Sequence, residues 1–318
     1  MASLKYIFLT TGDVDGIGLE VSIKALLKIG PITNVRFLLL ADSDQFKRWE
    51  KKISTSRFRL KICSELSDVE NPSHSKNTLC IFLRKDPPIQ WVEDVSRYCL
   101  KRGRTHGLVT GPLSKTGIHQ AGFKDLGHTD LLKRVSKRSS LFQTYLGSKM
   151  NVLLITDHLS LESVPKKVKD LKLMNEALKL CLPLKKQLKL SGSIGLLALD
   201  PHAGEEGIIG KQDQIHAQWI QKKSNKDLIG PIPADTAFEK SQRKKIGLYL
   251  ALYHDQGLIP FKTLHGFDEG VHLTLGLPFV RTSVDHGTAK EIFGKNLANP
   301  GSMKDAIKTA IRLIGSKK

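Results

Sequence analysis

Three histidines, His158, His202 and His254, have side chains that suit a borderline divalent metal ion. Three imidazole ligands would leave coordination positions open for substrate oxygens, as a catalytic metal site requires. The histidines lie far apart in the sequence, so no local spacing such as that of a helix-borne pair brings them together. Taken singly, each histidine is explained better as a hydrogen-bonded structural residue than as a metal ligand, and that alternative stays open.

Carboxylates lie close to all three histidines in the sequence: Asp157, Asp200 and Asp255. A neighbouring carboxylate can orient a metal-binding imidazole ring through its second nitrogen. Aspartates also cap helices and stabilise turns, so the sequence leaves both interpretations open.

Further polar groups suit an anionic or hydroxylated substrate. The segment 127–130, Gly-His-Thr-Asp, contains His128 and Thr129 at what we expect to be the start of a helix, where backbone amides favour anions. Lys262 and Arg281 add permanent cations, and arginine can hold a phosphate or carboxylate with two parallel hydrogen bonds. Capping of the helix by Thr129 is the structural alternative.

Apolar runs of strand length that end in polar loops indicate an α/β fold. Segments with helical spacing lie between these runs, for example 21–29, 92–100, 173–182 and 305–314. Because ligands of open α/β sheets bind beyond the carboxyl ends of the strands, we expect the polar residues there to converge. The predicted strands are 6–9, 107–109, 152–155, 194–199, 247–252 and 279–280, the last followed by a loop at 281–283.

The glycine-rich stretch 11–18, Thr-Gly-Asp-Val-Asp-Gly-Ile-Gly, follows the first predicted strand. Its glycine spacing matches neither the Rossmann nor the P-loop fingerprint, so it predicts no phosphate-binding loop of either kind. A tight structural turn explains it equally well.

Length and composition indicate a globular protein with two lobes or one large α/β unit in 318 residues. No signal peptide or membrane span is apparent, and four cysteines without a CxxC pair fit a reduced compartment, so we expect a cytoplasmic protein. The formal net charge of +19 favours anionic partners. Without interleaved aromatic residues, a solvated basic surface explains this charge better than nucleic-acid binding, which stays the non-enzyme alternative.

Taken together, the motifs resemble the 4-hydroxythreonine-4-phosphate dehydrogenase (PdxA) family over nearly the whole chain. Among them are Thr-Gly-Pro-Leu-Ser-Lys at 110–115, Asp-Pro-His-Ala-Gly-Glu at 200–205 and Pro-Ala-Asp-Thr at 233–236. Two longer matches are Tyr-His-Asp-Gln-Gly-Leu-Ile-Pro-Phe-Lys at 253–262 and Leu-Gly-Leu-Pro-Phe-Val-Arg-Thr-Ser-Val-Asp-His-Gly-Thr-Ala at 275–289.

The resemblance implies a two-lobed α/β fold like that of isocitrate and isopropylmalate dehydrogenases, with the active site in the interlobe cleft. We expect residues 1–125 plus 275–318 to form the first lobe, on the cofactor side. Residues 126–274 would form the second lobe, on the metal and substrate side. It also implies a homodimer whose partners share each active site.

The resemblance further implies residue roles. Asp235 and Asp255 match acidic positions and are the candidates for proton transfer. NAD, or NADP in its place, would bind along a loop, and a divalent ion (zinc, magnesium or cobalt) would bind the histidines. The implied metal ligands are His158, His202 and His254; the substrate-binding residues His128, Thr129, Lys262, His272 and Arg281; and the cofactor-binding residues Asp285, His286, Gly287 and Thr288.

The implied reaction is NAD-dependent oxidation of 4-phosphohydroxy-L-threonine at C3, followed by decarboxylation to 3-amino-2-oxopropyl phosphate in pyridoxal 5′-phosphate (vitamin B6) biosynthesis. A paralogous dehydrogenase for erythronate or threonate 4-phosphate, or for a carboxylated dihydrodiol, is the alternative. A metal-dependent hydrolase is another, although no hydrolase motif accompanies the histidines. The sequence departs from the family at His272, where an asparagine is usual, and at 292–296, where Phe293 replaces an alanine.

Overall fold

The computed structural model describes residues 3–70, 77–223, 225–266 and 269–315. Within these ranges the chain forms two compact units. The first unit contains residues up to 141 and those from 269 onward, and the second contains residues 142–266.

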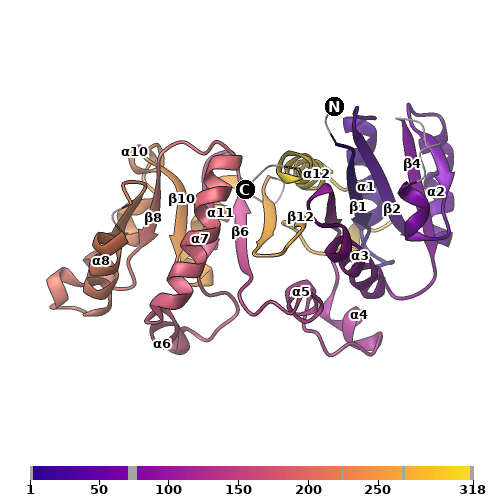
Figure 1. Ribbon diagram of the computed structural model, residues 1–318. Coiled ribbons are helices and arrows are strands. Elements are labelled where there is room, and N and C mark those ends of the chain that lie inside the picture. The colour runs from indigo at the N-terminus through magenta and orange to yellow at the C-terminus, as the bar shows by residue number, and fades with distance from the viewer. Residues whose placement is uncertain (1–2, 71–76, 224, 267–268, 316–318) are drawn as a thin grey trace. The chain divides into compact units, whose positions relative to one another are not determined.

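The first unit has a sheet with the strand order β3-β4-β2-β1-β5-β12-β11 (Figure 1). Neighbouring strands are parallel except β11, which runs antiparallel to β12. The strands are β1 (Lys5–Thr10), β2 (Val35–Asp42), β3 (Arg59–Ile62), β4 (Thr78–Arg84), β5 (His106–Thr110), β11 (Val271–Leu275) and β12 (Val280–Val284).

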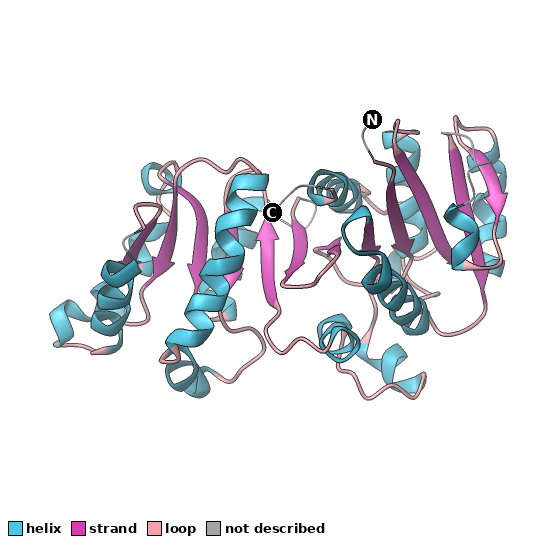
Figure 2. Cartoon of the chain, in the orientation of Figure 1, coloured by secondary structure: helices cyan, strands magenta, loops and turns pink. Residues whose placement is uncertain are grey.

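Helices of the first unit connect its strands (Figure 2). Local sequence sets their starts: Asp42 caps the helix after β2 by accepting hydrogen bonds from Asp44 N and Gln45 N at 3.0 and 2.9 Å. The helices are α1 (Gly18–Ile29), α2 (Ser43–Ser54), α3 (Pro88–Arg102), α4 (Lys115–Gln120), α5 (His128–Ser136) and α12 (Gly301–Leu313), with 3₁₀ turns η1 (Leu66–Glu70), η2 (Gly103–Thr105) and η5 (Lys290–Ile292).

Both faces of the central strands are buried in the first unit. Phe8 of β1 belongs to a hydrophobic cluster with Trp91 of α3 and Leu131 of α5. Its chain neighbours Ile7 and Leu9 are also fully buried, although they point to the opposite face. Burial on both faces is typical of a parallel sheet with helices on either side, and it explains why these strands are continuous apolar runs.

The second unit has a sheet with the order β6-β7-β10-β8-β9. β6 and β7 form an antiparallel pair, and the remaining neighbours are parallel. The elements are β6 (Phe142–Leu146), β7 (Asn151–Leu154), β8 (Ser193–Leu197), β9 (Leu228–Ile232), β10 (Ile246–Ala251), α6 (Val164–Val168), α7 (Leu171–Gln187), α8 (Gln212–Lys223), α9 (Ala234–Ala237), α10 (Lys240–Arg243), α11 (His254–His265), η3 (Leu161–Ser163) and η4 (Pro201–Gly207).

The predicted α/β fold is confirmed, and each predicted strand overlaps an observed one. One detail was wrong. The last predicted strand continues to Val284, so Arg281 lies inside β12 and not in a loop after it. The strand accommodates this cation because two threonine hydroxyls accept hydrogen bonds from it, as described below.

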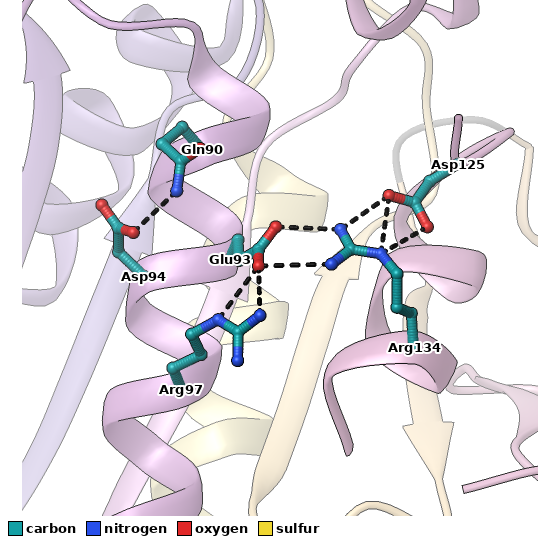
Figure 3. Close-up of polar contacts among 6 residues, drawn as sticks. All are labelled: Gln90, Glu93, Asp94, Arg97, Asp125 and Arg134. Atoms are coloured by element: carbon teal, nitrogen blue, oxygen red, sulfur yellow. Dashed lines mark hydrogen bonds and ion pairs between the residues drawn. The ribbon is translucent and has the colours of Figure 1, made fainter. Parts of the chain in front are cut away.

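The unit boundaries differ from those expected at 125/126 and 274/275. Helix α5 belongs to the first unit because it packs against α3. Figure 3 shows the polar part of this contact, where the guanidinium of Arg134 reaches both Glu93 of α3 and Asp125 before α5, each at 2.8 Å. Strand β11 likewise joins the first unit by pairing with β12. His128, Thr129 and His272 therefore lie in the first unit.

Within the described residues, no helix combines the length and the apolar character that crossing a membrane would require.

Replacing Glu93 by glutamine tests the contact between α3 and α5. Hydrogen bonds from Arg134 and Arg97 keep the pKa of Glu93 below its usual value, although partial burial acts in the opposite direction. A lowered folded-state pKa stabilises the fold above the unfolded-state value of roughly 4.3, and this contribution is lost as the pH falls through the folded-state pKa. Because Arg134 is 44% exposed, we expect Glu93→Gln to lower the free energy of unfolding near neutral pH by only on the order of 1 kcal/mol.

Urea unfolding at neutral and acidic pH measures this difference, which should shrink on acidification. The exposed Glu50→Gln variant is the control and should behave as the unchanged protein at both pH values. An equal loss for Glu93→Gln at both pH values would contradict the assigned role of the charge.

Candidate active site

The three predicted metal-binding histidines follow neighbouring strands of the second unit. His158 follows β7, His202 lies in η4 after β8, and His254 is the first residue of α11 after β10. Strand β10 is parallel to both β7 and β8, so all three strands end at the same edge of the sheet. The structure thus places the three histidine-bearing loops side by side, as strand order predicts.

Two side chains connect the ends of these strands. Thr156, after β7, donates its hydroxyl to the carbonyl oxygen of Leu252 at 2.6 Å. Gln256 accepts a hydrogen bond from the Leu252 amide at 2.7 Å and donates to the carbonyl oxygen of Ala198, after β8, at 2.6 Å. Because Thr156 and Gln256 are buried, breaking any of these hydrogen bonds would leave a buried polar group without a partner, which is unfavourable. Together they fix the spacing of the three loops.

Asp213 of α8 holds the start of the His202 loop. Its two carboxylate oxygens accept hydrogen bonds from the amides of Leu199 and Asp200, both at 2.9 Å. Asp213 is 1% exposed and stands beside the buried His216, whose Nε2 lies 3.0 Å from the carbonyl oxygen of Val168. Burial would raise the pKa of Asp213, but hydrogen bonds from His216 and the two amides outweigh it, so the pKa is lowered. The carboxylate is therefore charged when it holds the loop.

Sequence reasoning missed Asp213, Gln256 and Thr156 as positioning residues. Two of them had a signal in the sequence. Asp213 is a carboxylic acid one helical turn before the imidazole of His216, and Gln256 lies inside the long motif around His254.

His158 and His254 are close together, with ring centroids 5.5 Å apart. His254 Nδ1 lies 2.7 Å from the Asp255 carboxylate, which favours the tautomer with the proton on Nδ1 and leaves the Nε2 lone pair for a ligand. The carboxylate of Asp157, the residue before His158, accepts a hydrogen bond from Gln143 at 3.1 Å. This pair of imidazoles is the part of the predicted metal site that the structure brings together.

His202 begins a turn in which every residue through Glu206 has a positive φ, between 43° and 78°. Non-glycine residues rarely adopt this conformation, which costs roughly 1–2 kcal/mol per residue. Within the described ranges, no three His, Cys, Asp or Glu side chains are grouped closely enough to hold a metal ion. The assignment of His202 as third ligand stays a prediction.

The remaining predicted residues of the second unit lie on two helices. Asp235 is exposed on α9, which directly follows β9, and Asp255 is exposed beside His254. Lys262 is half-buried on α11, the helix that begins with His254. Asp255 thus contacts the ring of His254, and among the described residues Asp235 forms no hydrogen bond or ion pair with the three histidines.

In the first unit, Arg281 organises the predicted substrate-binding residues. It is 1% exposed and donates hydrogen bonds to the hydroxyls of Thr110 at 2.6 Å and Thr274 at 2.9 Å. Its guanidinium also lies 3.3 Å from Nδ1 of His272. Neither threonine was predicted from the sequence. A guanidinium stays protonated when it is buried, and its planar group of donors matches phosphate and carboxylate.

His128, the first residue of α5, lies within the electrostatic influence of Arg281. Burial first, and then the positive charge of Arg281, lower the pKa of His128 well below its usual value. Its Nε2 is buried and has no hydrogen-bond partner among the described residues. Because a neutral imidazole can donate or accept, His128 is suited to bind a polar group of a ligand. Thr129 follows it on the first turn of α5.

The predicted cofactor-binding loop 285–288 follows β12 and contacts the glycine-rich stretch. The carbonyl oxygen of Thr288 accepts a hydrogen bond from the amide of Ile17 at 3.0 Å, and the amide of Asp285 donates to the Ser302 hydroxyl at 3.0 Å. Gly12 has φ +79°, and a Cβ atom there would lie 2.1 Å from the carbonyl oxygen of Pro112. Glycine is needed at this position because the loop after β1 and the loop after β5 approach closely. A structural role for the glycine-rich stretch, as a tight turn, therefore explains Gly12.

A protein-family model described as "Pyridoxal phosphate biosynthetic protein PdxA" matches residues 89–310. A curated relative, the 4-hydroxythreonine-4-phosphate dehydrogenase of Sulfurihydrogenibium sp. (strain YO3AOP1), is 33% identical and covers 96% of this chain and 97% of its own. Another, the D-threonate 4-phosphate dehydrogenase of Bordetella bronchiseptica, is 32% identical and covers 96% of this chain and 91% of its own.

A solved structure, that of 4-hydroxythreonine-4-phosphate dehydrogenase from Klebsiella pneumoniae, is also similar. It has a TM-score of 0.76 at 26% identity and covers 99% of both chains. The likeness thus extends to the fold of nearly the whole chain.

Replacing Asp213 by alanine tests the anchor of the His202 loop. The amides of Leu199 and Asp200 lose their acceptor, and leaving buried groups unsatisfied costs about 1–3 kcal/mol each. We expect faster hydrogen exchange at these two amides, measured site by site, while amides in β1 keep their protection. Asp227→Ala, a change of the same kind at an exposed position, is the control and should leave both amides as they were. Unchanged exchange at Leu199 and Asp200 would contradict the anchoring role.

Proposed function

Because the chain belongs to the PdxA family of pyridoxal phosphate biosynthetic proteins, we propose that it is a dehydrogenase that oxidises 4-phosphohydroxy-L-threonine at C3. Decarboxylation of the resulting β-keto acid then gives 3-amino-2-oxopropyl phosphate. We assign NAD as the electron acceptor, with NADP as the second candidate. The cytoplasm is the proposed location and a homodimer with shared active sites the proposed assembly.

The observation that carries this proposal is the placement of His158 and His254 at adjacent strand ends, with ring centroids 5.5 Å apart. Two neighbouring imidazoles, one oriented by Asp255, have the donor chemistry that zinc or cobalt sites with open positions use, and magnesium, which prefers oxygen ligands, is the third candidate ion. His158, His254 and His202 would hold this divalent ion. When bound, such an ion polarises an oxygen atom and stabilises negative charge on it.

The chain's own residues bind and orient the substrate. Arg281 has the buried charge to bind a phosphate or carboxylate group, and His128 can contact a polar group in its neutral form. Lys262 supplies a second cation. We assign Thr129 and His272 to the same task, since Thr129 adjoins His128 and His272 adjoins Arg281.

Proton transfer is assigned to Asp255 or Asp235. Asp255 lies against the His254 ring, so it can accept a proton near the reacting atoms or orient that imidazole. Asp235 lies at the start of the helix after β9, two strands from β10 in the sheet. The cofactor is assigned to Asp285, His286, Gly287 and Thr288, a loop whose backbone is held by Ile17 and Ser302.

A second candidate substrate is D-threonate 4-phosphate, which the name of the Bordetella relative supports. The two substrates share the phosphate and the C3 hydroxyl and differ where one carries an ammonium group. His272, whose ring adjoins Arg281, is the residue in this chain that we expect to affect that choice.

A substrate panel tests the proposal directly. With 4-phosphohydroxy-L-threonine and NAD, we expect NADH absorbance to grow, to stop on chelation and to return with added divalent ion. His202→Ala should abolish turnover while circular dichroism shows an intact fold. Fast turnover of D-threonate or D-erythronate 4-phosphate with none of the amino substrate would replace the proposed substrate, and full activity of His202→Ala would remove this residue from the metal site.

Replacing His272 by alanine tests its assignment to substrate binding. Arg281 keeps its bonds to Thr110 and Thr274, so we expect KM to rise roughly tenfold, equivalent to about 1.4 kcal/mol, with a smaller change in kcat. His119→Ala removes an exposed histidine of α4 and is the matched control. A loss confined to kcat would contradict a role in binding.

A further inference from the structure

A cavity of about 300 Å³ lies in the first unit, and one of its lining residues, Gly16, is next to Thr288 of the assigned cofactor loop. It is lined by residues at the start of α1, by one face of α2 and by the segment after η5. The lining residues are Gly16, Leu19, Glu20, Gln45, Arg48, Trp49, Lys52, Phe293, Gly294 and Asn296.

Two aromatic side chains from different segments of the chain line this cavity. Trp49 comes from α2, and Phe293 comes from the segment in which the sequence departs from its family. Both are half-buried, so each presents apolar surface that the fold itself does not cover. Planar rings stack favourably on such surfaces, and the volume, at the small end of the usual range for ligand pockets, suits one ring better than a dinucleotide.

The cavity carries positive charge. The helical spacing of Gln45, Arg48, Trp49 and Lys52 puts these four side chains on one face of α2. Lys52 Nζ lies 5.1 Å from the centre of the Trp49 ring. Arg48 and Lys52 form no ion pair with any described residue, so both charges can meet a ligand. A phosphate monoester, with about −1.5 to −2 charges at neutral pH, matches two such cations.

The single lining carboxylate does not oppose an anion. Glu20 is 6% exposed and forms an ion pair with Lys24 at 2.6 Å. It also accepts a hydrogen bond from the Ala298 amide at 2.8 Å, while Lys24 donates to the carbonyl oxygens of Asn296 at 2.9 Å and Ala298 at 3.0 Å. These bonds neutralise Glu20 and hold the segment after η5 against α1.

We propose that this cavity, which lies next to the assigned cofactor loop, is a further ligand site for a small planar aromatic ring that carries a phosphate monoester. The ring lies between Trp49 and Phe293, and the phosphate binds Arg48 and Lys52. This proposal goes beyond the proposed function and does not depend on which substrate the dehydrogenase oxidises.

Pyridoxine 5′-phosphate is a suitable probe because it has one aromatic ring and one phosphate but no aldehyde to react with lysines. Its binding to the full chain is measured by titration calorimetry. In Arg48→Ser/Lys52→Ser both cations of the cavity are lost, and we expect the affinity to fall roughly tenfold or more. Lys47→Ser/Lys51→Ser removes the same charge from the same helix outside the cavity and should keep the affinity of the unchanged protein.

Phe293→Ala removes one aromatic wall and should weaken binding several-fold without affecting the fold, because this side chain lies in a loop. Unphosphorylated pyridoxine should bind much more weakly than the phosphate ester. The proposal is overturned if the Arg48→Ser/Lys52→Ser variant binds as tightly as the unchanged protein, since the probe then occupies another site. It is equally overturned if the unchanged protein shows no binding at millimolar probe, or if both double variants lose affinity alike.

Discussion

The candidate active site depends on a set of buried hydrogen bonds that join the ends of β7, β10 and β8. Gln256 is their centre, because one amide side chain accepts from the backbone after β10 and donates to the backbone after β8. Thr156 adds β7 through the same residue, Leu252. Side chains on loops are positioned only as well as the backbone beneath them, and here that backbone is fixed at three adjacent points.

The His202 loop shows what such an anchor makes possible. Its residues adopt a left-handed conformation that is unfavourable for all but glycine, so the surrounding structure must enforce it. Asp213 contributes at the start of the loop, where its two carboxylate oxygens accept hydrogen bonds from the amides of Leu199 and Asp200. Close packing contributes too, because a Cβ atom on Gly210 would lie 1.9 Å from the Asp200 carboxylate. The conformation of this loop is thus set by tertiary contacts.

Much of the architecture could be predicted from the sequence because it follows from local patterns. Apolar runs gave the central strands, and their polar exits correctly placed His158, His202 and His254 at one edge of a sheet. The pattern failed at Arg281, where a charged residue inside a strand looked like the beginning of a loop. The strand can contain this charged side chain because Arg281 donates hydrogen bonds to Thr110 and Thr274, which lie on other strands.

The other misses have the same origin. Helix α5 was assigned to the wrong unit because its contact with α3, through Arg134 and Glu93, joins residues distant in the sequence. Asp213 was overlooked because a buried acid on a helix resembles a solvent-exposed one until its partners are known. Periodicity reports what faces the core, whereas pairing between distant polar groups becomes visible only in three dimensions.

The threonine partners of Arg281 have a consequence for how this protein can evolve. Thr110 and Thr274 hold the guanidinium from two strands, so we expect Arg281 to keep its position when the residue at 272 changes. His272 is half-buried at the margin of that arrangement. A substitution at 272 can therefore change the side chain that we propose to contact the substrate while leaving the buried cation undisturbed. Selection for a new substrate would then proceed through single substitutions, and each variant along the way would still fold.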